Sequence, residues 1–194
     1  CAGPWSNRML ALAGVTLPNR LVPIRAQMVS KRFSERLKGP IPMVVDMMSG
    51  FYGRMEANGV QFICGSVREE NEREEVLDLD NYNEVADAPF REEHLRLIHH
   101  RVSTFHSRGE ITSYAGLYTV NQADYHPIID GTALEGFFAV CGFSGHGFKL
   151  SPVVGNLVTQ KVLGQWGRGK SEVPMDFFDA DRAPLNSNWG GVIA

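Results

Sequence analysis

The 194-residue sequence predicts an α/β fold, with an α+β arrangement in its middle part, from three patterns. In residues 51–66, two β-prone runs flank an Asn-Gly dipeptide, which strongly favours an antiparallel hairpin. In residues 95–105, apolar side chains recur at the spacing of one helical face. In residues 136–164, an apolar run leads through a glycine-rich turn into a helical segment that ends at a glycine.

The amino-terminal part predicts a short helix and then a long strand. Ser6 is a suitable N-cap for a helix that continues to Ala13. Residues 20–34 are predicted as a strand that leads into a second layer, and Pro23 restricts its first part to an edge or a crossover. Arg25 in this strand is either a buried bridge between the two layers or an ordinary surface arginine.

The middle part predicts an antiparallel meander in residues 42–66 and one covering helix that starts at Asp87 and Pro89. The charged run 68–75 is predicted as a solvated loop. The histidines of this part do not share one helical face, and no cysteine or carboxylate completes a ligand set, so no metal site is predicted. The histidines in question are His94, His99, His100 and His106.

The carboxyl-terminal part predicts a return strand in residues 111–120 and a hairpin at Asp130-Gly131. The hairpin delivers the chain to the apolar strand 136–140. Ser151 and Pro152 are predicted as the N-cap and the first residue of the last helix.

Composition excludes several classes of partner. A net charge of −3 provides no basic surface for nucleic acid and no polybasic segment for a membrane. The three cysteines are far apart and odd in number, which favours a reducing cytoplasm over a disulfide framework. The longest apolar runs are too short to cross a bilayer, and no signal peptide is evident.

The segment 142–151 carries the strongest functional signal. Its sequence is Gly-Phe-Ser-Gly-His-Gly-Phe-Lys-Leu-Ser, between an apolar strand and a helix. Free backbone N–H groups and the positive end of a helix dipole favour an electron-rich ligand there, and glycines let a flat ligand approach the backbone. The alternative is an ordinary connection between a strand and a helix.

The sequence of this segment resembles the flavin-contacting loop of the D-amino-acid oxidase superfamily, and within that superfamily it is most similar to the sarcosine oxidase and dimethylglycine dehydrogenase branch. Ala-Gly-Pro-Trp-Ser at 2–6 and Gly-Leu-Tyr-Thr with Asp-Tyr-His-Pro-Ile-Ile-Asp-Gly within 116–131 are similar to that branch as well. The resemblance implies bound FAD. The residues that it assigns to the cofactor are Gly3, Trp5, Gly142, Phe143, Ser144, Gly145, His146, Gly147, Phe148 and Lys149.

The resemblance also implies three residues that contact the substrate. Lys149 stands where the branch has a lysine that binds the substrate carboxylate, and Tyr118 and Tyr52 stand where it has aromatic hydroxyls. The alternatives are that Lys149 is an ordinary exposed lysine, and that the two tyrosines are strand residues with buried rings and solvent-exposed hydroxyl groups. The cysteine that carries covalent flavin in the monomeric oxidases corresponds to Gly116, so FAD is expected to be non-covalent through this half.

The expected organisation follows the same resemblance. Residues 1–19 and 116–170 belong to a truncated, Rossmann-like FAD domain, 20–115 to the substrate domain with a mixed or antiparallel sheet, and 171–194 to a tail. The dinucleotide fingerprint of such a domain is absent from the 194 residues. The chain is therefore expected to be a carboxyl-terminal half that needs an amino-terminal half or partner subunit, and to be inactive alone.

The expected function is oxidation of an N-methylated amino acid, such as sarcosine or dimethylglycine, by hydride transfer to flavin. Two alternatives stay open: a catalytically inactive fragment or subunit module, and an enzyme similar to D-amino-acid or glycine oxidase. Truncation of the flavin domain is expected to expose Phe137, Phe138 and Phe143, and therefore to cause self-association.

Overall fold

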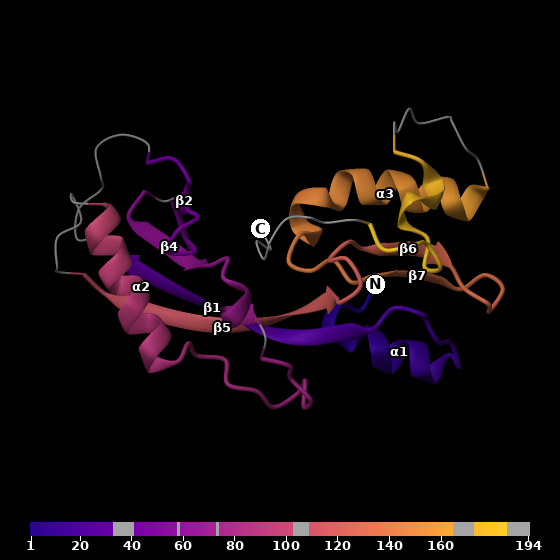
Figure 1. Cartoon of the computed structure of the whole chain (residues 1–194), viewed down its shortest axis with the longest axis horizontal. Helices are drawn as coiled ribbons and strands as arrows, with labels where there is room; N and C mark the ends of the chain where they lie inside the picture. Colours follow the sequence, from indigo (N-terminus) through magenta and orange to yellow (C-terminus); the bar gives the residue numbers. More distant parts are fainter. Residues whose placement is uncertain (33–40, 58, 73, 103–108, 165–172, 186–194) are drawn as a thin grey trace. The chain divides into compact units, whose positions relative to one another are not determined.

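A computed structural model shows a chain that divides into two compact units, which are described separately. The first unit contains Cys1–Ile24, Glu75–Leu79 and Leu117–Ala194, and the second contains Arg25–Glu74 and Asp80–Gly116. Strands β1 and β5 each contribute residues to both units (Figure 1). The structure describes residues 1–32, 41–57, 59–72, 74–102, 109–164 and 173–185.

The predicted mixture of helices and antiparallel strands is confirmed. The helices are α1 (Ser6–Leu12), α2 (Ala88–Arg101) and α3 (Gly147–Leu163), with short 3-10 turns at Gly3–Trp5, Glu69–Glu72 and Met175–Phe178. The strands are β1 (Leu21–Arg32), β2 (Val44–Asp46), β3 (Phe51–Met55), β4 (Gln61–Ser66), β5 (Ile111–Asn121), β6 (Ile128–Gly131) and β7 (Phe138–Cys141). None of the described helices is long and apolar enough to cross a membrane.

The five-stranded sheet has the order β2-β3-β4-β1-β5. The predicted hairpin is confirmed, since β3 and β4 pair in antiparallel register with Phe51 opposite Ser66 and Met55 opposite Phe62. Asn58 of the predicted Asn-Gly turn lies outside the described residues. A glycine is required at position 53, because a Cβ there would lie 2.5 Å from the Phe62 ring.

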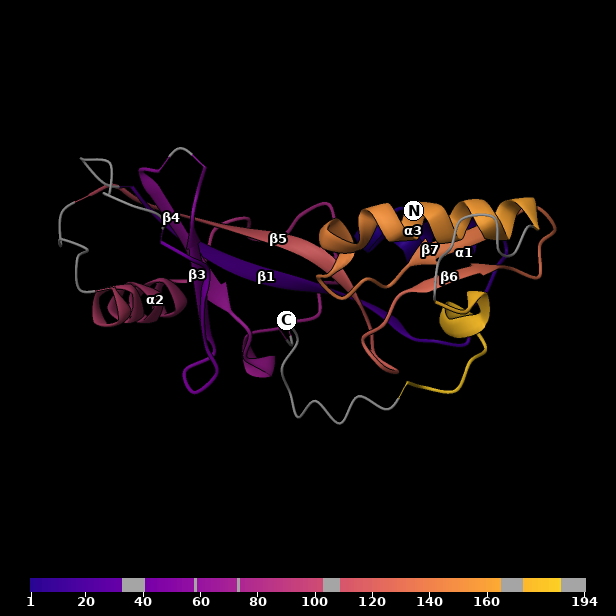
Figure 2. The same ribbon diagram turned by 90° about the horizontal axis from the view of Figure 1, so that it is seen from above.

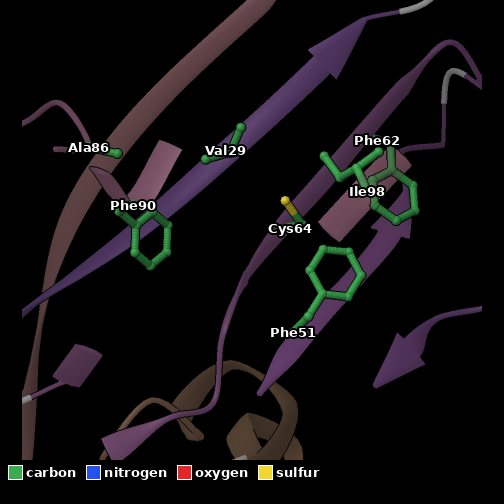
Figure 3. Close-up of a cluster of buried hydrophobic side chains, with 7 residues drawn as sticks. All are labelled: Val29, Phe51, Phe62, Cys64, Ala86, Phe90 and Ile98. Carbon is green, nitrogen blue, oxygen red and sulfur yellow. The ribbon is translucent and has the colours of Figure 1, made fainter. Parts of the chain in front are cut away.

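Helix α2 covers this sheet through a cluster of buried apolar side chains from β1, β3, β4, α2 and the residues just before it (Figure 3). The cluster consists of Val29, Phe51, Phe62, Cys64, Ala86, Phe90 and Ile98. Leu95 and Val102 of the predicted apolar stripe pack against it, whereas Phe105 lies outside the described residues. The helical spacing thus identified the face of α2 that meets the core.

His94 of α2 is a core residue, 2% exposed. Its ring stacks on Phe90 with centroids 3.8 Å apart, and Nδ1 lies 2.9 Å from the Phe90 carbonyl oxygen. Among the described residues, the one group of side chains close enough to share a metal ion contains no histidine. His106 lies outside those residues.

Burial of His94 makes the stability of the second unit sensitive to pH. Loss of hydration lowers the pKa of this histidine, so the folded state disfavours the proton that the unfolded state accepts. The contribution of neutral His94 to the free energy of unfolding is therefore fully present above the ordinary histidine pKa of about 6.5. This contribution is lost as pH falls toward the lower pKa of the folded state. We expect urea unfolding to show this loss as pH falls below about 6.5, and His94→Phe to remove it.

The first unit contains the antiparallel pair β6–β7 with α3 along it (Figure 2). Leu157 of α3 packs with Ile129 and Val140 of the two strands. Phe143 packs against this group, Phe137 against the cluster around Leu10, and Phe138 is half-buried. These three phenylalanines are half-buried, so they do not form the fully exposed apolar patch that was expected. Among the described residues, the most exposed large apolar side chains are Phe148, Met48, Leu77 and Leu12.

The predicted helix starts need correction. Helix α1 begins at Ser6, whose hydroxyl donates to the Gly3 carbonyl oxygen, so Ser6 is not its N-cap. Helix α3 begins at Gly147, five residues before the predicted first residue Pro152. Proline has no N–H for the carbonyl one turn earlier, but the Ser151 hydroxyl donates to that Phe148 oxygen over 2.9 Å. This local replacement lets the helix continue through the proline.

Candidate functional site

The predicted ligand loop joins β7 to α3, and its backbone is left-handed at three positions. Gly142 has φ +70°, Ser144 +48° and Gly145 +83°. Glycine adopts such values freely, whereas serine does so only where other contacts hold it. The Ser144 N–H donates to the Thr119 carbonyl oxygen over 2.9 Å, and the Ser144 hydroxyl accepts from the Asn121 N–H over 3.1 Å. The loop is thus fixed to the end of β5.

The loop leads directly into the amino end of α3. His146 is the N-cap residue, its N–H donates to the Phe143 carbonyl oxygen over 2.8 Å, and no side chain caps the helix. Gly147, Phe148 and Lys149 form the first turn, so Lys149 lies on the helix and not on the preceding loop. An uncapped first turn presents backbone N–H groups and the positive end of the helix dipole, which favour an electron-rich group.

Tyr118 is the predicted substrate-contacting residue that the structure places beside the loop. A Cβ on Gly145 would lie 3.6 Å from the Tyr118 ring, an ordinary packing distance, so the ring lies over this glycine. The half-buried ring also packs against Val22, Ile24 and Val120. Tyr118 therefore has both the structural role that its strand position suggested and a place next to the glycine turn.

Lys149 is exposed and makes no ion pair within the part of the chain that the structure describes. A cation in the first turn of a helix lies at the unfavourable, positive end of the dipole. Nothing in the helix itself requires a lysine at this position. A negatively charged ligand at the same place reverses the sign of that interaction.

The other predicted residues lie in separate surroundings. Gly3, with φ +52°, and the partly exposed Trp5 form the turn before α1 in the first unit. Tyr52 lies on β3 in the second unit, half-buried opposite Gly65, and its hydroxyl donates to the Met28 sulfur over 3.1 Å. The roles of these residues stay predictions.

A buried polar network behind the loop was not predicted. Asn121, at the end of β5, is fully buried, and its side-chain amide donates to an Asp124 carboxylate oxygen over 3.1 Å. Asp124 accepts a hydrogen bond from Arg182 over 2.9 Å. Asn121 and Asp124 sit three residues apart after a strand, which signals a turn. Arg182 follows 58 residues later, and no local pattern indicates that pairing.

Comparison with known protein families gives one match that covers most of the chain. Residues 1–161 match the model of the DAO family, described as FAD dependent oxidoreductase. "FAD-dependent oxidoreductase domain-containing protein 1" of Xenopus laevis is 33% identical over 172 residues, which are 84% of this chain and 34% of that protein. The Bos taurus protein of the same name is 29% identical over 174 residues, with the same coverage. The chain thus spans about a third of the length of the curated relatives it matches.

Solved structures agree on the fold. L-proline dehydrogenase from P. horikoshii aligns with a TM-score of 0.67 and 23% identity, over 93% of this chain and 45% of that one. Iminodiacetate oxidase from Chelativorans sp. BNC1 aligns with a TM-score of 0.71 and 20% identity, over 92% and 44%. Glycine oxidase from Geobacillus kaustophilus gives 0.70 and 19%, over 94% and 44%. With the family model matching residues 1–161 and this fold around the loop, the chain belongs to the DAO family of FAD-dependent oxidoreductases.

Proposed function

We propose that the chain is the substrate-binding and loop-bearing part of an FAD-dependent oxidoreductase that oxidises N-methylated amino acids such as sarcosine or dimethylglycine. The observation that carries the proposal is the uncapped first turn of α3, with an exposed Lys149 next to a left-handed glycine turn. Family membership supports FAD as the ligand. Three solved neighbours are named after reactions of glycine, L-proline and iminodiacetate, each of which has an amine and a carboxylate.

The residues around the loop fit a flat, electron-rich cofactor. Glycines at 142 and 145 permit the left-handed backbone of the turn, and the first turn of α3 has no side-chain cap on its N–H groups. Thr119, whose carbonyl oxygen holds Ser144, has a buried hydroxyl without a hydrogen-bond partner among the described residues. Buried hydroxyl groups are normally paired, so the unpaired Thr119 hydroxyl is an unfavourable feature that the fold tolerates beside this loop.

FAD is proposed to be held without a covalent bond in this part of the protein. Gly116 occupies the position that carries the flavin cysteine in the monomeric oxidases that the sequence resembles, and it has no side chain to form a thioether. The space where a Cβ would lie at Gly116 has no neighbour within 4 Å. Of the cysteines, Cys64 and Cys141 are buried, and burial raises the pKa of the Cys64 thiol to about 12 and that of Cys141 to about 11.

Lys149 is proposed to bind the carboxylate of the substrate, because a fixed cation is the natural partner of that group. Tyr118, over Gly145, is proposed to orient the substrate through its hydroxyl. The substrate-contacting role of Tyr52 is a separate proposal that rests on the sequence resemblance alone. Bound FAD would supply the acceptor for a hydride from the carbon next to the substrate nitrogen. The resulting iminium takes up water and releases the demethylated amine and formaldehyde.

A second candidate is a module that is not catalytic by itself. This alternative is kept because the 194 residues span about a third of the length of the curated relatives. An amino-terminal FAD-binding half or a partner subunit is therefore part of the proposal. Self-association of the chain also stays a proposal, through the half-buried Phe137, Phe138 and Phe143 together with exposed apolar residues such as Phe148.

Flavin binding tests the proposal directly. We expect protein that joins residues 1–194 to a dinucleotide-binding half to show a perturbed flavin spectrum, bleached anaerobically by sarcosine or dimethylglycine. Gly145→Ala strains a left-handed backbone at the loop and is expected to weaken FAD binding about 10-fold. Gly164→Ala introduces the same kind of strain at the far end of α3, where φ is +60°, and serves as the matched control.

Each other outcome has a defined meaning. Bleaching by glycine or D-alanine alone supports the glycine or D-amino-acid oxidase alternative. A bound flavin that no amine bleaches supports the non-catalytic module. Equal loss of FAD affinity in Gly145→Ala and Gly164→Ala excludes a specific role for the loop.

A further inference from the structure

The Asp124 carboxylate is the centre of the buried network behind the loop. Only 1% of its side chain is exposed. It accepts hydrogen bonds from the Asn121 side chain over 3.1 Å, from the His126 N–H over 3.0 Å and from the Leu185 N–H over 3.1 Å. An isolated carboxylate buried to this degree is unfavourable, and a cation beside it is needed to offset the lost hydration.

Arg182, in the tail after α3, supplies that cation. Its side chain is 7% exposed, and one Nη lies 2.9 and 3.1 Å from the two Asp124 oxygens. The tail itself is fixed to the unit, since Lys161 of α3 bridges Asp130 and Asp179 and the Ala180 N–H donates to Asp130 over 3.0 Å. Arg182 thus reaches Asp124 from an anchored backbone.

Asn121 connects this ion pair to the loop. Its side-chain amide binds Asp124 and the His126 carbonyl oxygen, while its backbone N–H donates to the Ser144 hydroxyl. Asn121 also lies close to Gly142, since a Cβ added to this glycine would lie 3.3 Å from the Asn121 Cβ. A buried asparagine held in this way fixes both contacts at once.

Ser144 is the residue of the loop that needs such support. Its φ of +48° is unusual for a residue with a Cβ, and it persists only where the surroundings hold it. The Asn121 N–H and the Thr119 carbonyl oxygen are its holding contacts. Movement of Asn121 therefore changes the loop at its most strained position.

We propose that Arg182 is a positioning residue for the cofactor loop, acting through Asp124 and Asn121 on Ser144. The tail then belongs to the functional site although it lies beyond residues 1–161, which match the family model. The part of the proposal that concerns FAD affinity rests on the proposed function. The part that concerns the loop backbone does not depend on it.

Amide hydrogen exchange of the 194-residue chain tests the loop backbone without any ligand. In Arg182→Met we expect the Asn121 and Ser144 amides to exchange about 10-fold faster. The Ile129 and Val140 amides of the β6–β7 pair in the same unit are expected to keep their rates. Arg182→Lys keeps a cation beside Asp124 and is expected to return the loop amides to within about threefold of the wild-type rates. Equal acceleration at Ile129 and Ser144 means general destabilisation and overturns the proposal.

FAD affinity is the second measurement, made on protein that joins the chain to its dinucleotide-binding half. Arg182→Met is expected to raise the Kd for FAD about 10-fold. Arg25→Met, which removes a buried arginine of the second unit, is expected to leave it unchanged. Wild-type protein without FAD binding contradicts the proposed function, and the exchange data still decide the role of Arg182.

A smaller change keeps the test decisive if Arg182→Met does not fold. Ser144→Ala removes one oxygen atom, the acceptor of the Asn121 N–H, and leaves the Arg182–Asp124 pair intact. It is expected to raise the exchange rate of the Asn121 amide about 10-fold, which is the factor expected for Arg182→Met. Unchanged exchange at Asn121 in Ser144→Ala contradicts the proposed link.

Discussion

Replacement of Arg25 by methionine is expected to lower the free energy of unfolding by about 3 kcal/mol. Its side chain is 2% exposed, and its guanidinium donates to the carbonyl oxygens of Asn83 and Val85 and to the carboxylates of Glu74 and Asp87. Methionine has similar length but leaves all four groups without their donor. The two carboxylates are about half exposed and regain water, so the main loss comes from the carbonyl groups and the packing.

Arg20 provides the control for this prediction. It pairs with Glu75 over 2.9 Å, but 63% of its side chain is exposed. Exposed pairs contribute less than about 1 kcal/mol, so Arg20→Met is expected to be nearly neutral. Urea unfolding of both variants makes the comparison. A loss in Arg25→Met no larger than in Arg20→Met would show that the buried guanidinium contributes nothing beyond a surface pair.

Arg25→Lys separates the charge from the geometry. Lysine keeps the positive charge, but it cannot donate in the fixed fork that reaches the Asn83 and Val85 carbonyl oxygens together. We expect this variant to recover less than half of the loss. The guanidinium also holds the pKa of Asp87 below its usual value. The free energy of unfolding of the wild type therefore falls in acid as that carboxylate takes up a proton. Arg25→Met is expected to lose this part of the pH dependence.

The parts of the fold that follow a short-range period were predictable. The hairpin β3–β4 and the apolar face of α2 both follow from spacings within a few residues, and both are confirmed. The start of α3 was not predictable from the same rules. Pro152 is a strong signal for a first helical position, and here the Ser151 hydroxyl satisfies the carbonyl that proline leaves free.

Buried polar residues were the other part that the sequence did not reveal. Arg25 was left with two interpretations, because its partner Glu74 stands 49 residues away. Glu74 also lies in the charged run 68–75, whose composition is typical of a solvated surface loop. Asp124 and Arg182 stand 58 residues apart. Pairing over such separations depends on the tertiary path of the chain, which no local pattern records. The loop at 142–147 was recognised from its amino-acid sequence, but the polar network that holds the loop was not predicted.

Replacement of Lys149 by methionine is expected to reduce kcat/KM for sarcosine or dimethylglycine about 100-fold, by loss of one charge-assisted hydrogen bond to the substrate carboxylate. The same change is expected to leave the free energy of unfolding unchanged or to raise it by about 0.5 kcal/mol. The reason is that a cation in the first turn of α3 opposes the helix dipole. Opposite effects on activity and stability identify a residue kept for its ligand.

The substrate provides the control for this last prediction. An N-methyl amine without a carboxylate, such as dimethylamine, gains nothing from the cation, so its slow turnover is expected to be the same in wild type and Lys149→Met. Lys149→Arg keeps the charge and is expected to recover part of the activity with sarcosine. A similar loss with both amines, or a clear fall in stability, would mean that Lys149 supports the helix and that another cation binds the carboxylate. Because Lys149 makes no ion pair among the described residues, the structure favours the first result.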